Sequence, residues 1–307
     1  MTEKKHFIHD SLLGYVPNPG FCGSGFGRSF HTIDADGLRF SGDGLVSSEG
    51  PILAVGDSFT YGDEVRDEEA WPAQLQRLTG RRVLNGGVTG YGFDQTVLRA
   101  EQLAVVHRPS VIIVSFISDD IPRTEMRCLW WRDKPWFAIE NDQLVLKGVP
   151  VPDRPRLPPR LRLRVERILL ALPHIAQQLA GYHVRVHSAG FGLSIAQRLI
   201  GRLARLQADR GVKIILMAQY SPDFWRYKAV TDKQRRLTQA ILDGAAAHGL
   251  ATQDTLPRFA TEPKPDDFFA LTHLNARGNL MVASLLAARL PALLETSASP
   301  AARPGSR

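Results

Sequence analysis

The chain has 307 residues, of which 44% are hydrophobic and 22% charged, an ordinary composition for a globular protein. This length suits one large domain, or one domain with a sizeable insertion. The formal net charge of +7 can favour nucleic acid or an anionic membrane surface, but the sequence has no helix-turn-helix, zinc-finger or aromatic RNA-binding motif, so we predict no nucleic-acid partner.

The first 49 residues are rich in glycine, proline and aspartate and show little hydrophobic periodicity. We predict that residues 1–49 form an arm packed on the main domain. The opening stretch, MTEKKHFIHD, has no apolar signal-peptide core, which favours a cytoplasmic protein. Cys22 and Cys128 lack the spacing of metal ligands, so we expect free thiols rather than a disulfide, and neither a metal nor another cofactor.

A regular alternation of strands and helices begins after the arm. The predicted strands cover residues 51–56, 82–85, 110–117, 212–218 and 250–253, and the predicted helices cover 69–79, 95–107, 194–209, 232–248 and 276–290. The strand at 110–117 is continuous and β-branched, as expected for a strand buried on both faces. The alternation predicts an α/β fold with a parallel sheet covered on both faces.

Residues 121–190 interrupt this alternation with clustered prolines, an arginine-rich segment at 154–167 and three tryptophans. The tryptophans are Trp130, Trp131 and Trp136. We predict an insertion within a core that spans residues 50–293, followed by a disordered tail over 294–307. The arginines are typical of a solvated face, and contact with an anionic lipid surface is the less favoured alternative. The tryptophans either line an acyl or sugar pocket or pack the core of the insertion.

Three polar segments directly follow predicted strands: Ser58, the glycine-rich loop 86–93, and Ser118–Asp120. The carboxyl ends of parallel strands share one edge of a sheet, so we expect these segments to gather at one rim. His273, just before the last helix, can return to that rim. A serine becomes nucleophilic when a histidine removes its proton, and backbone N–H groups stabilise the oxyanion. The structural alternatives are a helix cap at Ser58 and a core histidine at 273.

Four blocks in this order carry a family resemblance. They are GDSFTYG (56–62), NGGVTGYG (85–92), SFISDD (115–120) and HLNARGN (273–279). Over residues 50–120 and 190–290 the chain resembles the SGNH, or GDSL-type, hydrolases. The resemblance implies a three-layer α/β/α sandwich with a parallel, flavodoxin-like sheet, and serine esterase activity.

The resemblance also implies a role for each matching residue. Ser58 would be the nucleophile and would donate its own N–H to the oxyanion. Gly87 matches the glycine of the second block, whose N–H is another donor, and His273 matches the catalytic base. Asp119 stands where the family has an asparagine that supplies a third donor. An ionised carboxylate would repel an oxyanion, so Asp119 could donate only when protonated.

The acid that orients the histidine departs from the family pattern. The family places an aspartate three residues before the histidine, and this chain has Ala270 there. Asp266 and Asp267 lie just upstream, and we take Asp267 as the candidate orienting acid. Without such an acid the site would be a serine–histidine dyad, which can retain activity at a reduced rate.

Together these features predict a serine ester hydrolase. It would remove an acyl group from a small-molecule, lipid or carbohydrate ester through an acyl-serine intermediate. An O-acyltransferase that uses the same serine is one alternative, favoured if the insertion excludes water from the site. A binding protein that keeps the fold without turnover is the other, because Ala270 and Asp119 replace family residues. The predicted partner is a small-molecule ester, and no motif bears on the oligomeric state.

Overall fold

The computed structural model of the protein describes residues 4–25, 29–43, 49–154, 165, 168–169 and 171–295. Most of the arginine-rich segment at 154–167 lies outside these residues, as does the predicted tail beyond Glu295.

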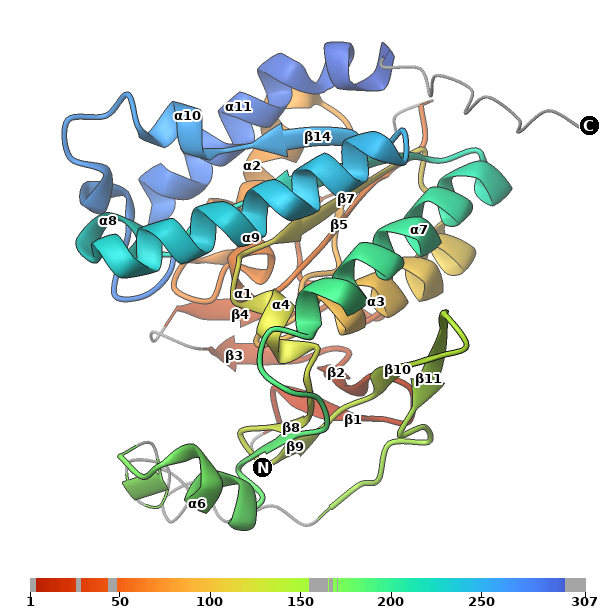
Figure 1. Cartoon of the computed structure of the whole chain (residues 1–307). Coiled ribbons are helices and arrows are strands. Elements are labelled where there is room, and N and C mark those ends of the chain that lie inside the picture. The colour runs from red at the N-terminus through yellow and green to blue at the C-terminus, as the bar shows by residue number, and fades with distance from the viewer. Residues whose placement is uncertain are drawn as a thin grey trace, which may run out of the picture.

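A parallel sheet lies at the centre of the molecule (Figure 1). Its strands are β5 (Ile52–Val55), β6 (Val83–Asn85), β7 (Val111–Phe116), β13 (Lys213–Ala218) and β14 (Ala251–Asp254). They follow the spatial order β14-β13-β7-β5-β6, which is the flavodoxin-like order of a doubly wound sheet. The predicted fold class is therefore confirmed.

Helices cover both faces of this sheet. One face carries α3 (Phe93–His107), α7 (Gly192–Arg210) and α9 (Lys228–Ala247), and the other carries α2 (Trp71–Thr79) and α11 (Ala276–Glu295). Strand β5 shows why two layers form, because alternate side chains of a strand face opposite sides. Leu53 and Val55 pack with the first group of helices, whereas Ile52 and Ala54 pack with the second.

Short helical turns follow several strands at the carboxyl edge of the sheet. They are α1 (Ser58–Tyr61), η2 (Asp67–Glu69), α4 (Asp120–Arg123), α8 (Asp223–Arg226), α10 (Leu256–Phe259) and η3 (Pro265–Phe268). The strand order reverses between β5 and β7, because β6 lies beside β5 on one side and β7 on the other. In open α/β sheets ligands bind at such a switch point, and α1 and α4 both begin there.

Smaller sheets flank this edge. The N-terminal strands are β1 (Phe7–Asp10), β2 (Gly14–Pro17), β3 (Cys22–Ser24) and β4 (Phe30–Thr32). The segment between α4 and α7 adds β8 (Met126–Leu129), β9 (Arg132–Asp133), β10 (Trp136–Glu140), β11 (Gln143–Lys147), α6 (His174–Leu179) and β12 (His183–Arg185). Figure 1 shows both groups below the main sheet, on the side of α1 and α4. Cys22 and Cys128 are free thiols, as predicted.

A buried ion pair ties this added segment to the core. Lys134 Nζ lies 2.5 Å from Asp94 Oδ2 on α3, and the two side chains are 1% and 0% exposed. The same ammonium group donates to the carbonyls of Met126 and Pro135, at 3.1 and 2.9 Å. Lys134 therefore links the β8–β9 hairpin to a helix that covers the main sheet.

Helix α11 is long and apolar enough to cross a membrane by length and composition alone. Its Val282, Ala283 and Leu286 are fully buried in the apolar cluster that it shares with α2 and the sheet, which is the arrangement of a core helix. The helix runs to Glu295, so residues 294–295, expected in the tail, are helical.

Candidate active site

Ser58 is the first residue of α1, directly after β5 and its Gly56-Asp57 turn. The helix cap is Asp57, whose Oδ1 accepts the Phe59 N–H at 2.9 Å. The Ser58 hydroxyl instead lies 2.8 Å from Nε2 of His273, across 215 positions of sequence. The two residues predicted to react together are therefore in hydrogen-bond contact, and the capping alternative for Ser58 does not hold.

His273 sits in a tight loop that leads into α11. The Ala270 N–H donates to the His273 carbonyl at 2.8 Å, which closes the loop. The imidazole packs against the Phe59 ring, with the ring centroids 5.1 Å apart. Its side chain is 13% exposed, so Nε2 faces Ser58 from a largely buried position.

The carboxylate at the other ring nitrogen belongs to Glu64. Glu64 Oε1 lies 3.2 Å from His273 Nδ1, and the Glu64 side chain is 3% exposed. Its oxygens also accept the Leu271 N–H and the Thr272 hydroxyl, both at 2.8 Å. Glu64 thus holds the loop that carries His273 and pairs with the ring itself.

The prediction of Asp267 as the orienting acid is corrected by this geometry. Asp267 is an exposed residue of η3, and its backbone carbonyl accepts the Asn275 side-chain amide at 2.8 Å. The loop after η3 folds back so that the N–H groups of Leu271 and Thr272 face Glu64. The one local signal for Glu64 is its place in the sequence, six residues after Ser58 and just beyond α1.

The pKa values around His273 suit an acid–base pair. Burial opposes the Glu64 charge, but hydrogen bonds from His273 and Thr272 lower its pKa to about 2, so it is ionised at neutral pH. Burial likewise opposes a protonated His273. The hydrogen bond with Glu64, followed by the charges of Asp63 and Asp57, outweighs that effect and raises the pKa of the ring.

Asp63 is a second carboxylate beside the same histidine. It is 1% exposed, and its Oδ2 lies 4.0 Å from Nε2, on the side of the ring that faces Ser58. Its other oxygen accepts the hydroxyl of Thr89 from the glycine-rich loop. Burial raises the pKa of Asp63 to about 6, against the lowering effect of His273. Sequence reasoning did not single out this residue.

A buried cluster centred on Arg123 holds the rim together. Arg123 Nη1 lies 2.6 Å from Asp120 Oδ1 and 3.5 Å from Asp57 Oδ2, and it donates to the Tyr91 carbonyl at 2.9 Å. Burial raises the pKa of Asp57 and of Asp120, and for Asp120 the charge of Asp57 raises it further. The cluster therefore joins the turn after β5, the glycine-rich loop and α4.

The described residues contain no group of three His, Cys, Asp or Glu side chains that could hold a metal ion.

Gly87 is needed for packing in this structure. A Cβ at Gly87 would lie 2.5 Å from the Tyr61 nitrogen on α1, so only glycine lets the loop approach the helix this closely. Its N–H donates to Asn85 Oδ1 at 3.1 Å. The predicted oxyanion donor is therefore already engaged within the protein.

Asp119, the residue expected at the third donor position, lies in the turn between β7 and α4. It is exposed, while Ser118 and Asp120 on either side of it are buried. The Asp120 carboxylate accepts the Ile117 N–H at 3.1 Å and pairs with Arg123, which turns it inward. Because neighbouring residues of a helical turn point in different directions, Asp119 is left facing solvent.

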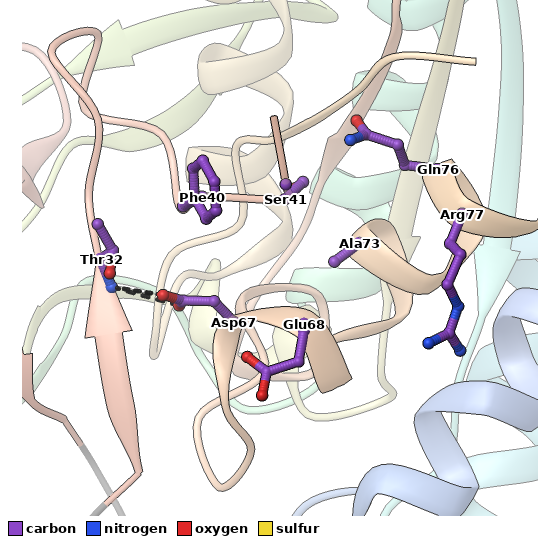
Figure 2. Close-up of a pocket in the computed structure, with 9 residues that line it drawn as sticks. Thr32, Phe40, Ser41, Asp67, Glu68, Ala73, Gln76 and Arg77 are labelled. Carbon is purple, nitrogen blue, oxygen red and sulfur yellow. Dashed lines mark hydrogen bonds between the residues drawn. The ribbon is translucent and has the colours of Figure 1, made fainter. Parts of the chain in front are cut away.

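A separate pocket of about 370 Å³ opens beside β4, η2 and α2 (Figure 2). Neither Ser58 nor His273 lines it. Asp67 on its wall is already bonded to the Thr32 N–H at 3.0 Å and to Arg39 Nε at 2.9 Å. This pocket is therefore distinct from the rim where the serine and histidine meet.

Comparisons with known proteins give the family of the chain. The model of the GDSL-like lipase/acylhydrolase family matches residues 54–280. Similar solved structures include an α/β-hydrolase enzyme from the metagenome of Lake Arreo, Spain, which is 15% identical, with 81% of this chain and 99% of that chain covered and a TM-score of 0.49.

Two further similar structures come from bacteria. A lipase/acylhydrolase from Enterococcus faecalis is 13% identical, with 79% of this chain and 96% of that chain covered and a TM-score of 0.48. A catalytic mutant of an acetylxylan esterase from Geobacillus stearothermophilus is 12% identical, with 79% and 94% covered and a TM-score of 0.49. No curated protein matches the chain. Because the family model covers most of its length, the chain belongs to the GDSL-like lipase/acylhydrolase family and is an ester-bond hydrolase.

Proposed function

We propose that the protein cleaves small-molecule esters through an acyl intermediate on Ser58. The observation that carries this proposal is the continuous contact Ser58 Oγ–His273 Nε2–His273 Nδ1–Glu64 Oε1, at 2.8 Å for the hydroxyl and 3.2 Å for the carboxylate. A hydroxyl bonded to a base that a third group orients is the arrangement of an activated nucleophile.

The reaction follows from this contact. As the Ser58 oxygen attacks the carbonyl carbon, its proton passes to His273 Nε2 and the carbonyl electron pair moves to oxygen. The C–O bond to the alcohol then breaks, and the proton on Nε2 goes to the departing alcohol oxygen. Water repeats the sequence on the acyl-serine and releases the carboxylic acid. In both halves Glu64 stabilises the imidazolium that forms.

The oxyanion donors in this proposal are the N–H groups of Ser58 and Gly90. Ser58 opens α1, where backbone N–H groups lack intrahelical acceptors. Gly90 has a φ of +78°, and the Thr89 carbonyl before it accepts the Tyr15 hydroxyl at 2.8 Å. The N–H of that peptide points the opposite way, and no group in the described part of the chain accepts it. Gly90 therefore replaces Gly87 as the second donor.

The test is turnover of p-nitrophenyl acetate by the purified chain and its Ser58→Ala variant. We expect Ser58→Ala to lose about 10³-fold or more in kcat, as removal of a catalytic serine does elsewhere. A fluorophosphonate should label the wild-type protein on the peptide that contains Ser58, and labelling should disappear in His273→Ala. Equal turnover by wild type and Ser58→Ala would overturn the proposal.

Ser29 offers a matched control, because it forms another serine–histidine contact. Its Oγ lies 2.7 Å from Nε2 of His31. Burial, followed by the charge of Arg39, lowers the pKa of that histidine to about 3, so His31 is a poor proton acceptor. Ser29→Ala should keep its phosphonate labelling and most of its turnover.

Product analysis in the presence of added alcohols separates hydrolysis from acyl transfer. Hydrolysis gives the free carboxylic acid, whereas acyl transfer gives an ester of the added alcohol.

A further inference from the structure

The turn between β8 and β9 carries two tryptophans in an unusual backbone conformation. Trp130 and Trp131 have φ values of 51° and 55°, in the left-handed region that bulky residues rarely adopt. Such strain persists where the surrounding structure fixes it, and it occurs frequently at functional sites. The two indoles of this turn have different surroundings.

The indole of Trp130 lies against the glycine-rich loop of the active site. A Cβ at Gly90 would be only 2.7 Å from Trp130 Cζ3, so the ring occupies the space beside this glycine. The Arg123 guanidinium lies 5.6 Å from the indole centroid, and the His183 ring meets it edge-on at 5.8 Å. The ring thus contacts His183 of the segment between α4 and α7, and it also contacts Gly90 and Arg123 of the rim that carries Ser58, which we call the catalytic rim.

Trp131 faces away from this loop. Its indole N–H donates to the Ala180 carbonyl after α6 at 3.0 Å, and its ring meets Tyr182 edge-on at 4.9 Å. Both partners belong to the segment between α4 and α7. The two neighbours therefore share sequence context and backbone conformation, but only Trp130 touches the catalytic rim.

Two chains of contacts place Trp130 near the reacting atoms. Through Gly90 and Thr89 the loop reaches Asp63, which lies 4.0 Å from His273 Nε2. Through Arg123 the ring is linked to Asp57, whose Oδ2 is 3.5 Å from Ser58 Oγ. Trp130 is itself partly exposed.

The stereochemistry of acyl transfer indicates which part of the ester meets this ring. The departing alcohol oxygen must lie beside His273 Nε2 to receive its proton, and the oxyanion must face the Ser58 and Gly90 N–H groups. The acyl chain then extends from the carbonyl carbon away from the histidine. Trp130 lies against Gly90, one of the two proposed oxyanion donors. In the arrangement proposed above, a ring beside this loop would meet the acyl chain rather than the departing alcohol.

We propose that Trp130 forms the wall of the acyl site and restricts the protein to esters of short acyl chains. This inference rests on the proposed function, since it assumes attack by Ser58. The segment between α4 and α7 thereby sets specificity through one aromatic side chain placed beside the oxyanion loop.

The test compares p-nitrophenyl acetate with p-nitrophenyl octanoate in Trp130→Gly and Trp131→Gly. Glycine suits the positive φ at both positions, so each variant removes an indole without added backbone strain. We expect Trp130→Gly to raise the octanoate-to-acetate ratio of kcat/KM by about tenfold or more, the scale on which a few methylenes change discrimination. Trp131→Gly should leave the ratio unchanged. Trp130→Leu, which keeps an apolar side chain, should give an intermediate ratio if Trp130→Gly folds poorly.

The possible failures are distinguishable. A wild-type protein that hydrolyses neither ester would refute the proposed function. A wild-type protein that turns over acetate, with a ratio that does not rise in Trp130→Gly and Trp130→Leu, would refute only the acyl-wall inference. An equal rise in Trp131→Gly would also refute it, because that result would indicate general loosening of the turn.

Discussion

The adjacent acids Asp63 and Glu64 lie near different ring nitrogens of His273. Glu64 Oε1 is 3.2 Å from Nδ1 of His273, and Asp63 Oδ2 is 4.0 Å from Nε2. Glu64 is bonded to the ring and to the backbone of its loop, so it orients His273 and favours its protonated form. Asp63 has no such bond to the ring, and its effect on His273 is that of a nearby negative charge.

The first prediction concerns that charge. Three carboxylates act on His273, those of Glu64, Asp63 and Asp57, and together they raise its pKa against the effect of burial. Catalysis requires the neutral ring, so kcat should rise with pH through this raised pKa. Asp63→Asn removes one negative charge, which lowers the pKa and keeps the ring neutral to lower pH. We expect the acid limb of the kcat profile to move down by about one pH unit.

Asp266→Asn is the control for this pH profile. Asp266 is half-exposed and pairs with Arg226 at 3.1 Å, and it is not among the groups that shift the pKa of His273. Its profile should match that of the wild type. An acid limb that stays in place or moves upward in Asp63→Asn would contradict the electrostatic role of Asp63.

At the scale of elements, the sheet and its covering helices are predictable because their side chains repeat locally. The strand predicted at 110–117 is β7 at Val111–Phe116, and the helix predicted at 95–107 is α3 at Phe93–His107. The N-terminal strands were harder to predict, since β3 and β4 have only three residues each and show no clear alternation. Their pairing depends on contacts that a short window cannot show.

The residues of the site also fall into those that local sequence patterns predict and those that they do not. Ser58 and His273 stand in local patterns, and the parallel sheet predicts that they meet. Glu64 was missed because its contact with His273 spans 209 positions and has no fixed spacing. Asp119 is exposed between the buried Ser118 and Asp120, and within one helical turn a shift of one residue exchanges the buried and exposed faces. Side-chain direction at a turn depends on tertiary partners such as Arg123.

The link between the added segment and the core gives a prediction at this scale. Lys134→Met would leave the Asp94 carboxylate buried without its partner. Breaking a buried pair on one side costs about 3–5 kcal/mol, so the free energy of unfolding in urea should fall by that amount. Lys147→Met is the control. Its pair with Glu140 is 36% and 51% exposed, and exposed pairs contribute about 1 kcal/mol or less. Equal losses in both variants would contradict the anchoring role of Lys134.

At the scale of the whole molecule, the fold brings remote segments to one switch point. Ser58 and Glu64 follow β5, His273 precedes α11, and the glycine-rich loop follows β6. The order β14-β13-β7-β5-β6 places the ends of β5 and β7 side by side, so Ser58 lies at the switch point between them. The chain has Ala270 three residues before His273, and the carboxylate that contacts the ring comes instead from Glu64, six residues after Ser58.

The central claim is that Ser58, His273 and Glu64 act as one unit, and kcat for p-nitrophenyl acetate in Glu64→Gln and Asp267→Asn tests it most directly. Loss of an orienting acid lowers kcat by about 10⁴-fold in other serine hydrolases, so Glu64→Gln should fall on that scale. Its residual activity should show an acid limb at lower pH, because the pKa of His273 drops, and a purely structural defect would not produce that shift. Asp267→Asn should keep its kcat. A large loss in Asp267→Asn with nearly full activity in Glu64→Gln would contradict the account.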